Sequence, residues 1–205
     1  MPDRSMSFAR AGARFAGCAL ALGSLGALPV AARAAAPNPR VAMTIEKRGT
    51  FVIELFPKAA PKTVAHFLSL VKSHFYDGIL FHRYVQGFVV QGGDPKSKTV
   101  KPEDIANISA EEVGDKYGLG AGGSTLGTVP LEATLPHDRG TIGLARSQAP
   151  DSGDSQFFIN LAPNHRLDYQ YCVFGKVVQG MDKIDQIRQG DRIKSIRLAP
   201  APEKK

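Results

Sequence analysis

The chain has 205 residues and a formal net charge of +7, with 26 lysines and arginines, 19 acidic residues and no tryptophan. The positive residues are scattered rather than gathered into a basic run, which argues against nucleic-acid binding. Without its first 36 residues the chain has about 169 residues, which is ample for one domain with a single buried core. The histidines do not pair at the spacings that local metal sites use, so we expect no metal.

Residues 1–36 have the three-part pattern of a secretory signal peptide. Three arginines precede an apolar stretch, residues 15–30, and a run of small residues follows it. Glycines break this stretch, and it is shorter than the roughly 20 residues of a membrane span, so a membrane anchor is the poorer interpretation. We predict cleavage after Ala34 or Ala36, export to the periplasm, and no membrane attachment after cleavage.

Residues 37–200 are expected to form one domain, followed by a short flexible tail at residues 201–205. The domain begins with VAMTIEKRGTFVIELF, in which alternating residues on either side of a Lys-Arg-Gly turn predict an antiparallel hairpin. Pro61 then opens a helix over residues 61–75, because apolar residues recur there at helical spacing and proline is tolerated in a first turn. One face of this helix is expected to pack on the sheet.

Short apolar segments bounded by glycine, proline, aspartate or asparagine predict six further strands. These segments are residues 80–83, 88–91, 141–145, 156–160, 171–178 and 193–199. A second, short helix is predicted over residues 181–187, directly ahead of the last strand. The pattern favours a mainly β fold, a closed eight-stranded antiparallel β-barrel capped by two α-helices, because closure removes exposed sheet edges.

Residues 95–140 form a long connection rich in glycine, proline, lysine and acidic residues. Ser109 and Glu112 match a capping box, which predicts one helical turn after them. Three glycines between residues 118 and 123 match the dinucleotide-binding pattern, but no strand precedes them and no helix-forming run follows. A flexible loop is therefore favoured there over a nucleotide site.

In GFVVQGG, residues 87–93, strand alternation directs Val89 and Gln91 to one face. Gly87 permits a kink that turns Phe88 toward that same face. Periodicity leaves two positions open for Phe88, one in the core and one lining a groove. No nucleophile or acid pair accompanies this face, so the residues indicate a binding groove without a covalent catalyst.

A second segment, SQFFIN, places Gln156 and Phe158 on one face and Phe157 on the other. Phe157 and Phe81 are expected in the core, whereas Phe158 fits either a core or a groove position. Cys172 is expected to be a buried, inert side chain because its apolar neighbours raise the pKa of its thiol.

Four blocks, FHRYVQGFVVQGGD, RGTIGLARS, SGDSQFFIN and YCVFGKVVQGMD, resemble the cyclophilin-type peptidyl-prolyl cis-trans isomerases. The similarity runs from Val41 to about Leu198, and four blocks in the same order are more specific than any single motif. The family is an eight-stranded barrel with two helices. The resemblance implies an isomerase that acts on the peptide bond before proline, binds proline-containing polypeptides and needs no cofactor, and we expect a monomer.

The resemblance also implies the residues of the site. Arg83, Gln91 and His82 form the implied catalytic set, with Arg83 as the donor to the proline nitrogen. The implied substrate-binding residues are Phe88, Val89, Arg146, Ser147, Gln148, Gln156, Phe158, Leu167 and Tyr171.

Three positions depart from the family pattern. Val89 stands where many relatives have methionine, Arg166 where the cyclosporin-sensitive members have tryptophan, and Tyr171 where those members have histidine. Loss of the indole donor predicts weak cyclosporin binding. An alternative function is a binding module or chaperone that holds proline-containing segments in the same groove with little catalysis. Arg83 favours the enzyme, because holding an apolar segment does not require a cation.

Overall fold

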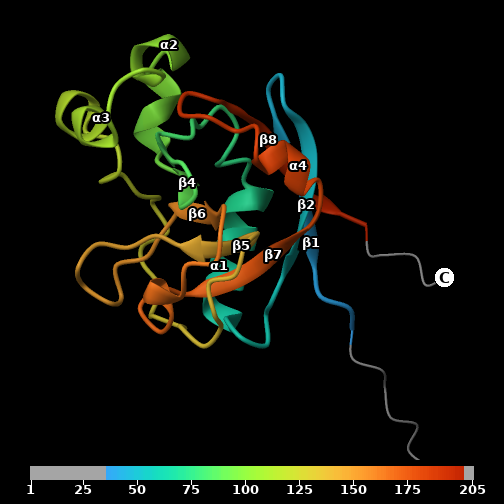
Figure 1. Cartoon of the computed structure of the whole chain (residues 1–205). Coiled ribbons are helices and arrows are strands. Elements are labelled where there is room, and N and C mark those ends of the chain that lie inside the picture. The colour runs from blue at the N-terminus through green and yellow to red at the C-terminus, as the bar shows by residue number, and fades with distance from the viewer. Residues whose placement is uncertain (1–35, 201–205) are drawn as a thin grey trace, which may run out of the picture. The chain divides into compact units, whose positions relative to one another are not determined.

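Eight antiparallel strands form one curled sheet in the computed structural model, which describes residues 36–200 (Figure 1). Their order across the sheet is β3-β4-β6-β5-β7-β2-β1-β8. The strands are β1 (Arg40–Ile45), β2 (Gly49–Leu55), β3 (Arg83–Val85), β4 (Val89–Gly92), β5 (Thr141–Leu144), β6 (Phe157–Asn160), β7 (Val173–Gln179) and β8 (Ile193–Ala199). The predicted tail lies outside the described residues, and so does the predicted signal peptide apart from its last residue, Ala36.

The mainly β, antiparallel architecture is confirmed, but within residues 36–200 no strand pairing joins the two edge strands, β3 and β8. The segment that precedes β3 does meet the start of β8 and the residues just before it. Phe81 N donates to Asp191 O at 2.9 Å and Ile193 N donates to Ile79 O at 2.8 Å. The strand predicted at residues 80–83 is therefore corrected, since β3 begins only at Arg83.

The first helix, α1 (Pro61–Lys72), packs its apolar face against the sheet. The ring of Phe67 lies 5.1 Å from the ring of Phe174 on β7 and 6.2 Å from the ring of Phe157 on β6. The helix ends three residues before the predicted position 75, and His74 just beyond it has a φ of 61°. A left-handed residue cannot continue a right-handed helix, which explains the earlier end.

The second predicted helix, α4 (Met181–Ile184), is also shorter than the sequence pattern indicates. Ile184 and Ile187 are both fully buried, so the apolar periodicity reflects burial beyond the last helical residue. Within residues 36–200, no helix combines the length and the apolar character needed to cross a bilayer.

The connection expected as a loop contains three short helical elements, which corrects that expectation for residues 95–117. These are a 3₁₀ helix, η1 (Pro95–Thr99), and the helices α2 (Pro102–Ile105) and α3 (Ala110–Tyr117), which lie together at one side of the fold (Figure 1). The predicted capping box is confirmed, since Glu112 N donates to Ser109 Oγ at 3.1 Å and Ser109 N to Glu112 Oε2 at 2.8 Å. These helices have a small core of their own, made by Leu80, Ile105, Val113 and Leu119.

Candidate active site

A cavity of about 190 Å³, here called the apolar pocket, opens beside β4, β6 and the 3₁₀ helix η2 (His165–Leu167). It brings together eight of the twelve residues that the resemblance implies. Its lining consists of Arg83, Phe88, Val89, Gln91, Ala145, Arg146, Phe158, Leu167 and Tyr171.

A second cavity, of about 260 Å³, lies next to the apolar pocket and is here called the glycine pocket. Its walls include residues 120–123, Ser147, Asp154 and Gln156. The two cavities share Gln91, Ala145 and Arg146. They therefore form two compartments of one groove.

Strand register places the key side chains in one row. Arg83 on β3 pairs with Gln91 on β4, and Gln91 pairs with Phe158 on β6. Directly opposed residues of antiparallel strands point to the same face of a sheet, so these three side chains share the groove. Gly87, with a φ of 69°, closes the turn between β3 and β4 and brings Phe88 into the apolar pocket. The predicted kink at Gly87 is confirmed.

Core and groove positions separate as the strand alternation indicates. Phe81 and Phe157 are fully buried in the core. Phe158 is 5% exposed and lines the apolar pocket, and so does the half-buried Phe88, which resolves both open positions in favour of the groove. Cys172 is buried and burial raises the pKa of its thiol to about 11, as expected for an inert cysteine.

Arg83 presents an uncommitted charge to the apolar pocket. Its guanidinium is half buried, and among residues 36–200 it has no ion pair and no side-chain hydrogen bond. Burial lowers the pKa of Arg83, and Arg166 lowers it further by a smaller amount. An arginine remains protonated at neutral pH despite such a shift, so the pocket contains a fixed cation with free N–H donors.

The neighbouring amide, Gln91, is held from the glycine-pocket side. Gln91 Nε2 donates to Gln156 Oε1 at 3.2 Å, and Gln156 Nε2 donates to the carbonyl of Gly122 at 2.8 Å. In the described part of the chain, no side-chain hydrogen bond joins Gln91 to Arg83. Both amides thus have fixed positions along the groove.

The structure does not bring the ring of His82 into either cavity. His82 is 3% exposed, and within residues 36–200 neither ring nitrogen has a hydrogen-bond partner. Burial is the main reason that the pKa of His82 falls to about 4. Its backbone N–H donates to Gln91 O at 3.1 Å, so His82 contacts the site through its main chain.

The loop after β5 contributes residues to different degrees. Arg146 stacks its guanidinium 4.8 Å from the centroid of the Tyr171 ring and donates through Nε to Gln170 O at 2.8 Å. Ser147 lines the glycine pocket. Gln148 is exposed and lines neither cavity, although its carbonyl accepts a hydrogen bond from Arg146 at 3.0 Å.

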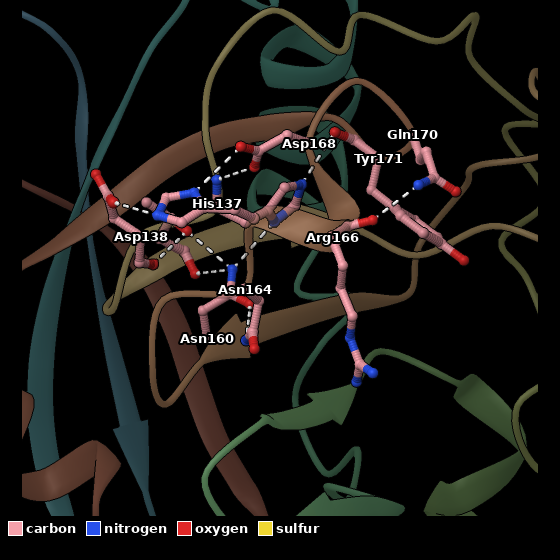
Figure 2. A network of polar contacts seen from close by, with 10 residues as sticks. His137, Asp138, Asn160, Asn164, Arg166, Asp168, Gln170 and Tyr171 are labelled. Carbon is pink, nitrogen blue, oxygen red and sulfur yellow. Dashed lines mark hydrogen bonds and ion pairs between the residues drawn. The ribbon is translucent and has the colours of Figure 1, made fainter.

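A buried polar network supports the apolar pocket (Figure 2). The ring of His137 stacks on Phe158 with centroids 5.6 Å apart. His137 Nε2 donates to the carbonyl of Tyr171, which leaves Nδ1 to accept from Asn160 Nδ2 at 3.1 Å. Burial lowers the pKa of His137, which agrees with this neutral form. Asn164 Nδ2 extends the network to the carbonyl of Phe88 at 3.0 Å.

Two acidic residues that the sequence interpretation missed hold residues 120–124, a segment that includes the pocket-lining residues 120–123 and is here called the glycine wall. Asp94 is fully buried and accepts from Gly120 N at 2.7 Å and Gly122 N at 2.9 Å. Asp154 accepts from Ser124 N and from the His66 ring. Each acid directly follows a glycine, in QGGD and SGD, which is a signal for a side chain that bonds nearby backbone. These contacts correct the expectation of a flexible loop at these glycines.

Within residues 36–200, histidine, cysteine and acidic side chains nowhere gather in a group of three that could hold a metal ion.

Comparisons with known proteins agree with this geometry. Residues 40–202 match the family model described as "Cyclophilin type peptidyl-prolyl cis-trans isomerase/CLD". A "Probable peptidyl-prolyl cis-trans isomerase" of Brucella suis biovar 1 is 41% identical over 187 residues, which cover 90% of this chain and 88% of the relative. A "Peptidyl-prolyl cis-trans isomerase" of Acinetobacter baylyi is 38% identical over 168 residues, covering 80% of this chain and 78% of the relative.

Solved structures show the same similarity. A cyclophilin-type isomerase of Cryptosporidium parvum superposes with a TM-score of 0.64 at 27% identity and covers 80% of this chain and 99% of its own. A structure of that protein in the presence of the dipeptide Ala-Pro gives a TM-score of 0.63 at 26% identity and covers 79% of this chain and 99% of its own. The chain therefore belongs to the cyclophilin-type peptidyl-prolyl cis-trans isomerases, and its activity is the cis-trans isomerisation of peptide bonds that precede proline.

Proposed function

We propose that the apolar pocket binds the proline ring and that the residues before proline extend into the glycine pocket. The pocket floor and walls include Phe88, Val89, Phe158 and Leu167, which suit an apolar ring. Burial of proline leaves no N–H unsatisfied, because its nitrogen carries none. The adjoining glycine pocket carries polar side chains and shares Gln91, Ala145 and Arg146 with the apolar pocket, so a chain ahead of the ring can continue into it.

Arg83 then acts as the catalytic donor. Rotation about the bond before proline breaks amide resonance, against a barrier of roughly 18–20 kcal/mol. In the twisted transition state the proline nitrogen recovers a localised lone pair, so a charged N–H donor aimed at it stabilises that state more than the planar one. Every 1.4 kcal/mol or so gained in this way is worth about a factor of ten in rate.

The observation that carries this proposal is the free guanidinium of Arg83 inside an apolar cavity. A half-buried cation without an ion-pair partner among the described residues is unfavourable unless a ligand uses it. Gln91, its cross-strand partner, is placed to hold the substrate backbone, and the Gln156 amide keeps Gln91 in position. A module that only holds apolar segments has no need of this charge.

The proposed clients are exported polypeptides that fold after translocation. The support is the signal-peptide pattern of residues 1–36. We further propose that the mature chain is a periplasmic monomer and that the sheet closes into a barrel. The hydrogen bonds between residues 79–81 and 191–193 support that closure. Cell fractionation and N-terminal sequencing test the export step, and a cytoplasmic protein that retains Met1 would contradict it.

Peptide binding tests the proposed site. An Ala-Ala-Pro-Ala peptide titrated onto the ¹⁵N-labelled protein is expected to shift the amides of Gln91, Val89 and Phe158 most. Phe158→Ala should weaken binding, because it removes a wall of the pocket, whereas Leu198→Ala, at a side chain with 54% exposure, should not. Shifts gathered around the helical insert at residues 95–117 instead would place the substrate elsewhere.

A further inference from the structure

Arg166 lies at the rim of the apolar pocket with its charge directed to the ring of Phe88. It belongs to η2 and is exposed, and its guanidinium carbon lies 4.4 Å from the centroid of that ring. Figure 2 shows its side chain extending away from the polar network that anchors the neighbouring residues. The next residue, Leu167, lines the apolar pocket. Arg166 is therefore fixed beside the pocket rather than within the network.

The charge of Arg166 is uncommitted in the described part of the chain, where it has no ion pair. Asp168, the nearest acid in the sequence, instead accepts from His137 N at 2.7 Å and contacts the His165 ring at 3.1 Å. Arg139 and Arg197, in contrast, each pair with an aspartate. A ligand can thus reach the Arg166 guanidinium without breaking a salt bridge.

The order of residues along the groove places Arg166 beyond the proline ring. The glycine pocket joins the apolar pocket at Gln91 and Arg146, whereas Phe88 and Leu167 line only the apolar pocket. A peptide whose residues before proline occupy the glycine pocket can leave the groove past Phe88, on the side away from the glycine pocket. The residues after proline therefore pass the Arg166 guanidinium, since each extended residue advances the chain by about 3.3 Å.

Two positively charged side chains lie around Phe88, and within residues 36–200 no acidic residue lines the pocket beside them. Arg83 lies 5.7 Å from the same ring centroid, so two guanidinium groups face one aromatic ring. Among residues 36–200, no acidic residue lines the apolar pocket, and the acid that lines the groove, Asp154, lies in the glycine pocket. Arg166 also lowers the pKa of Arg83, as expected from the repulsion between two cations that face one ring. An anion after the proline relieves that repulsion.

We propose that Arg166 is a specificity-determining residue that selects substrates with an acidic side chain within the two residues that follow proline. The proposal rests on the proposed function for the direction of the bound peptide. Basic side chains in the two positions after proline are disfavoured, because they are repelled by the Arg166 guanidinium.

Four peptides of equal length test this preference by NMR exchange spectroscopy. Three carry Glu-Glu, Gln-Gln or Lys-Lys directly after an Ala-Ala-Ala-Pro core, and the fourth is Glu-Glu-Ala-Pro-Gln-Gln. We expect kcat/KM for Glu-Glu after proline to exceed that for Gln-Gln by about two- to five-fold, the range of a solvent-exposed ion pair. Lys-Lys should lie below Gln-Gln. At about 1 M salt, where the Debye length is about 3 Å, the preference should vanish.

Variants assign the preference to one side chain. Arg166→Gln should bring the Glu-Glu to Gln-Gln ratio to about one, and Arg166→Lys should restore part of it. Lys98→Gln is the matched control, because Lys98 is also an exposed cation over a phenylalanine ring, 5.5 Å from the Phe75 centroid, and lines neither cavity. It should keep the wild-type ratio.

Two results overturn the proposal even when all peptides are isomerised. One is a Glu-Glu to Gln-Gln ratio of kcat/KM that stays the same in Arg166→Gln. The other is an equal rise in kcat/KM when the glutamates stand before proline. Dissociation constants of the same peptides, measured by amide shifts, give a second readout. If no peptide is isomerised, the proposed function fails. Even then, an affinity for Glu-Glu after proline that depends on Arg166 supports this inference, and equal affinities for all peptides overturn it.

Discussion

At the scale of single residues, the width of the apolar pocket depends on a glycine. Gly143 on β5 pairs with Phe158 on β6. A methyl group on Gly143 would lie 2.5 Å from Cζ of that ring, far closer than carbon atoms pack. The absence of a side chain at this position leaves the space that the ring occupies.

Gly143→Ala is therefore expected to push the Phe158 ring into the pocket and to lower kcat/KM by about tenfold, an effect of the size that overpacking gives. Gly114→Ala, within α3, is the control, because its added methyl meets only Leu119 O, at 3.6 Å. That change should raise the free energy of unfolding by up to about 1 kcal/mol and leave activity unchanged. Full activity in Gly143→Ala contradicts this view of the pocket.

The buried ring of His82 predicts a pH dependence of stability. Its pKa of about 4 lies below the ordinary value of 6.5, because burial disfavours the charged ring. Above about pH 6.5 the ring is neutral in both the folded and the unfolded protein, so the free energy of unfolding has its full value. As pH falls from 6.5 toward 4, only the unfolded protein binds a proton at this ring, and the free energy of unfolding decreases. The loss amounts to about 3 kcal/mol, at 1.36 kcal/mol per pKa unit. Urea titrations at pH 7 and pH 4 should show this difference, and His82→Leu should reduce it by that amount. An unchanged difference contradicts it.

At the scale of elements, the glycine wall is held by contacts that are remote in the sequence. Asp94 bonds the amides of Gly120 and Gly122, which lie 26 and 28 residues away. The carbonyl of Gly122 in turn orients Gln156, and Gln156 orients Gln91. One buried carboxylate is therefore coupled to the groove through a chain of hydrogen bonds.

Asp94→Ala is expected to release the glycine wall. Amide hydrogen exchange at Gly120 and Gly122 should accelerate, and kcat/KM should fall by about three- to tenfold as Gln156 loses its fixed partner. Asp94→Asn keeps one acceptor oxygen and should give a smaller effect. Asp104→Asn, at an exposed acid of α2, should change neither quantity. Slow exchange retained in Asp94→Ala shows that the wall is held by other contacts.

The contrast between strands and loops explains how much of the site the sequence predicts. Strand alternation is a local signal, so the facing of Phe157 and Phe158 and the kink at Gly87 follow from a few residues. The capping box of α3 is equally local. The glycine wall has no local signal of its own, because its acceptors come from other segments. The start of β3 at Arg83 also depends on a remote partner, since residues 79–81 bond residues 190–193.

At the scale of the whole molecule, the sheet and α1 are joined by an aromatic core. Phe157 makes edge-on contacts with Phe67, Tyr76 and Phe81, at centroid distances of 6.2, 5.6 and 6.1 Å. Phe157 also directly precedes Phe158 of the apolar pocket. The core and the groove are thus opposite faces of the same strand.

Phe157→Ala should lower the free energy of unfolding by about 3–5 kcal/mol, the cost of a large cavity in a packed core. Leu198→Ala, at a side chain that is 54% exposed, should change it by less than about 0.5 kcal/mol. Urea unfolding followed by circular dichroism measures both. A cost below about 1 kcal/mol for Phe157→Ala means that this aromatic cluster does not hold the sheet to α1.

The most direct test of the central claim is the rate of cis-trans exchange in an Ala-Pro peptide, measured by NMR exchange spectroscopy with the wild-type protein and with Arg83→Ala. We expect the wild-type protein to accelerate exchange strongly and Arg83→Ala to lose at least about tenfold of that acceleration while still binding the peptide. Equal acceleration by both proteins would show that the free cation in the apolar pocket is not the catalytic donor.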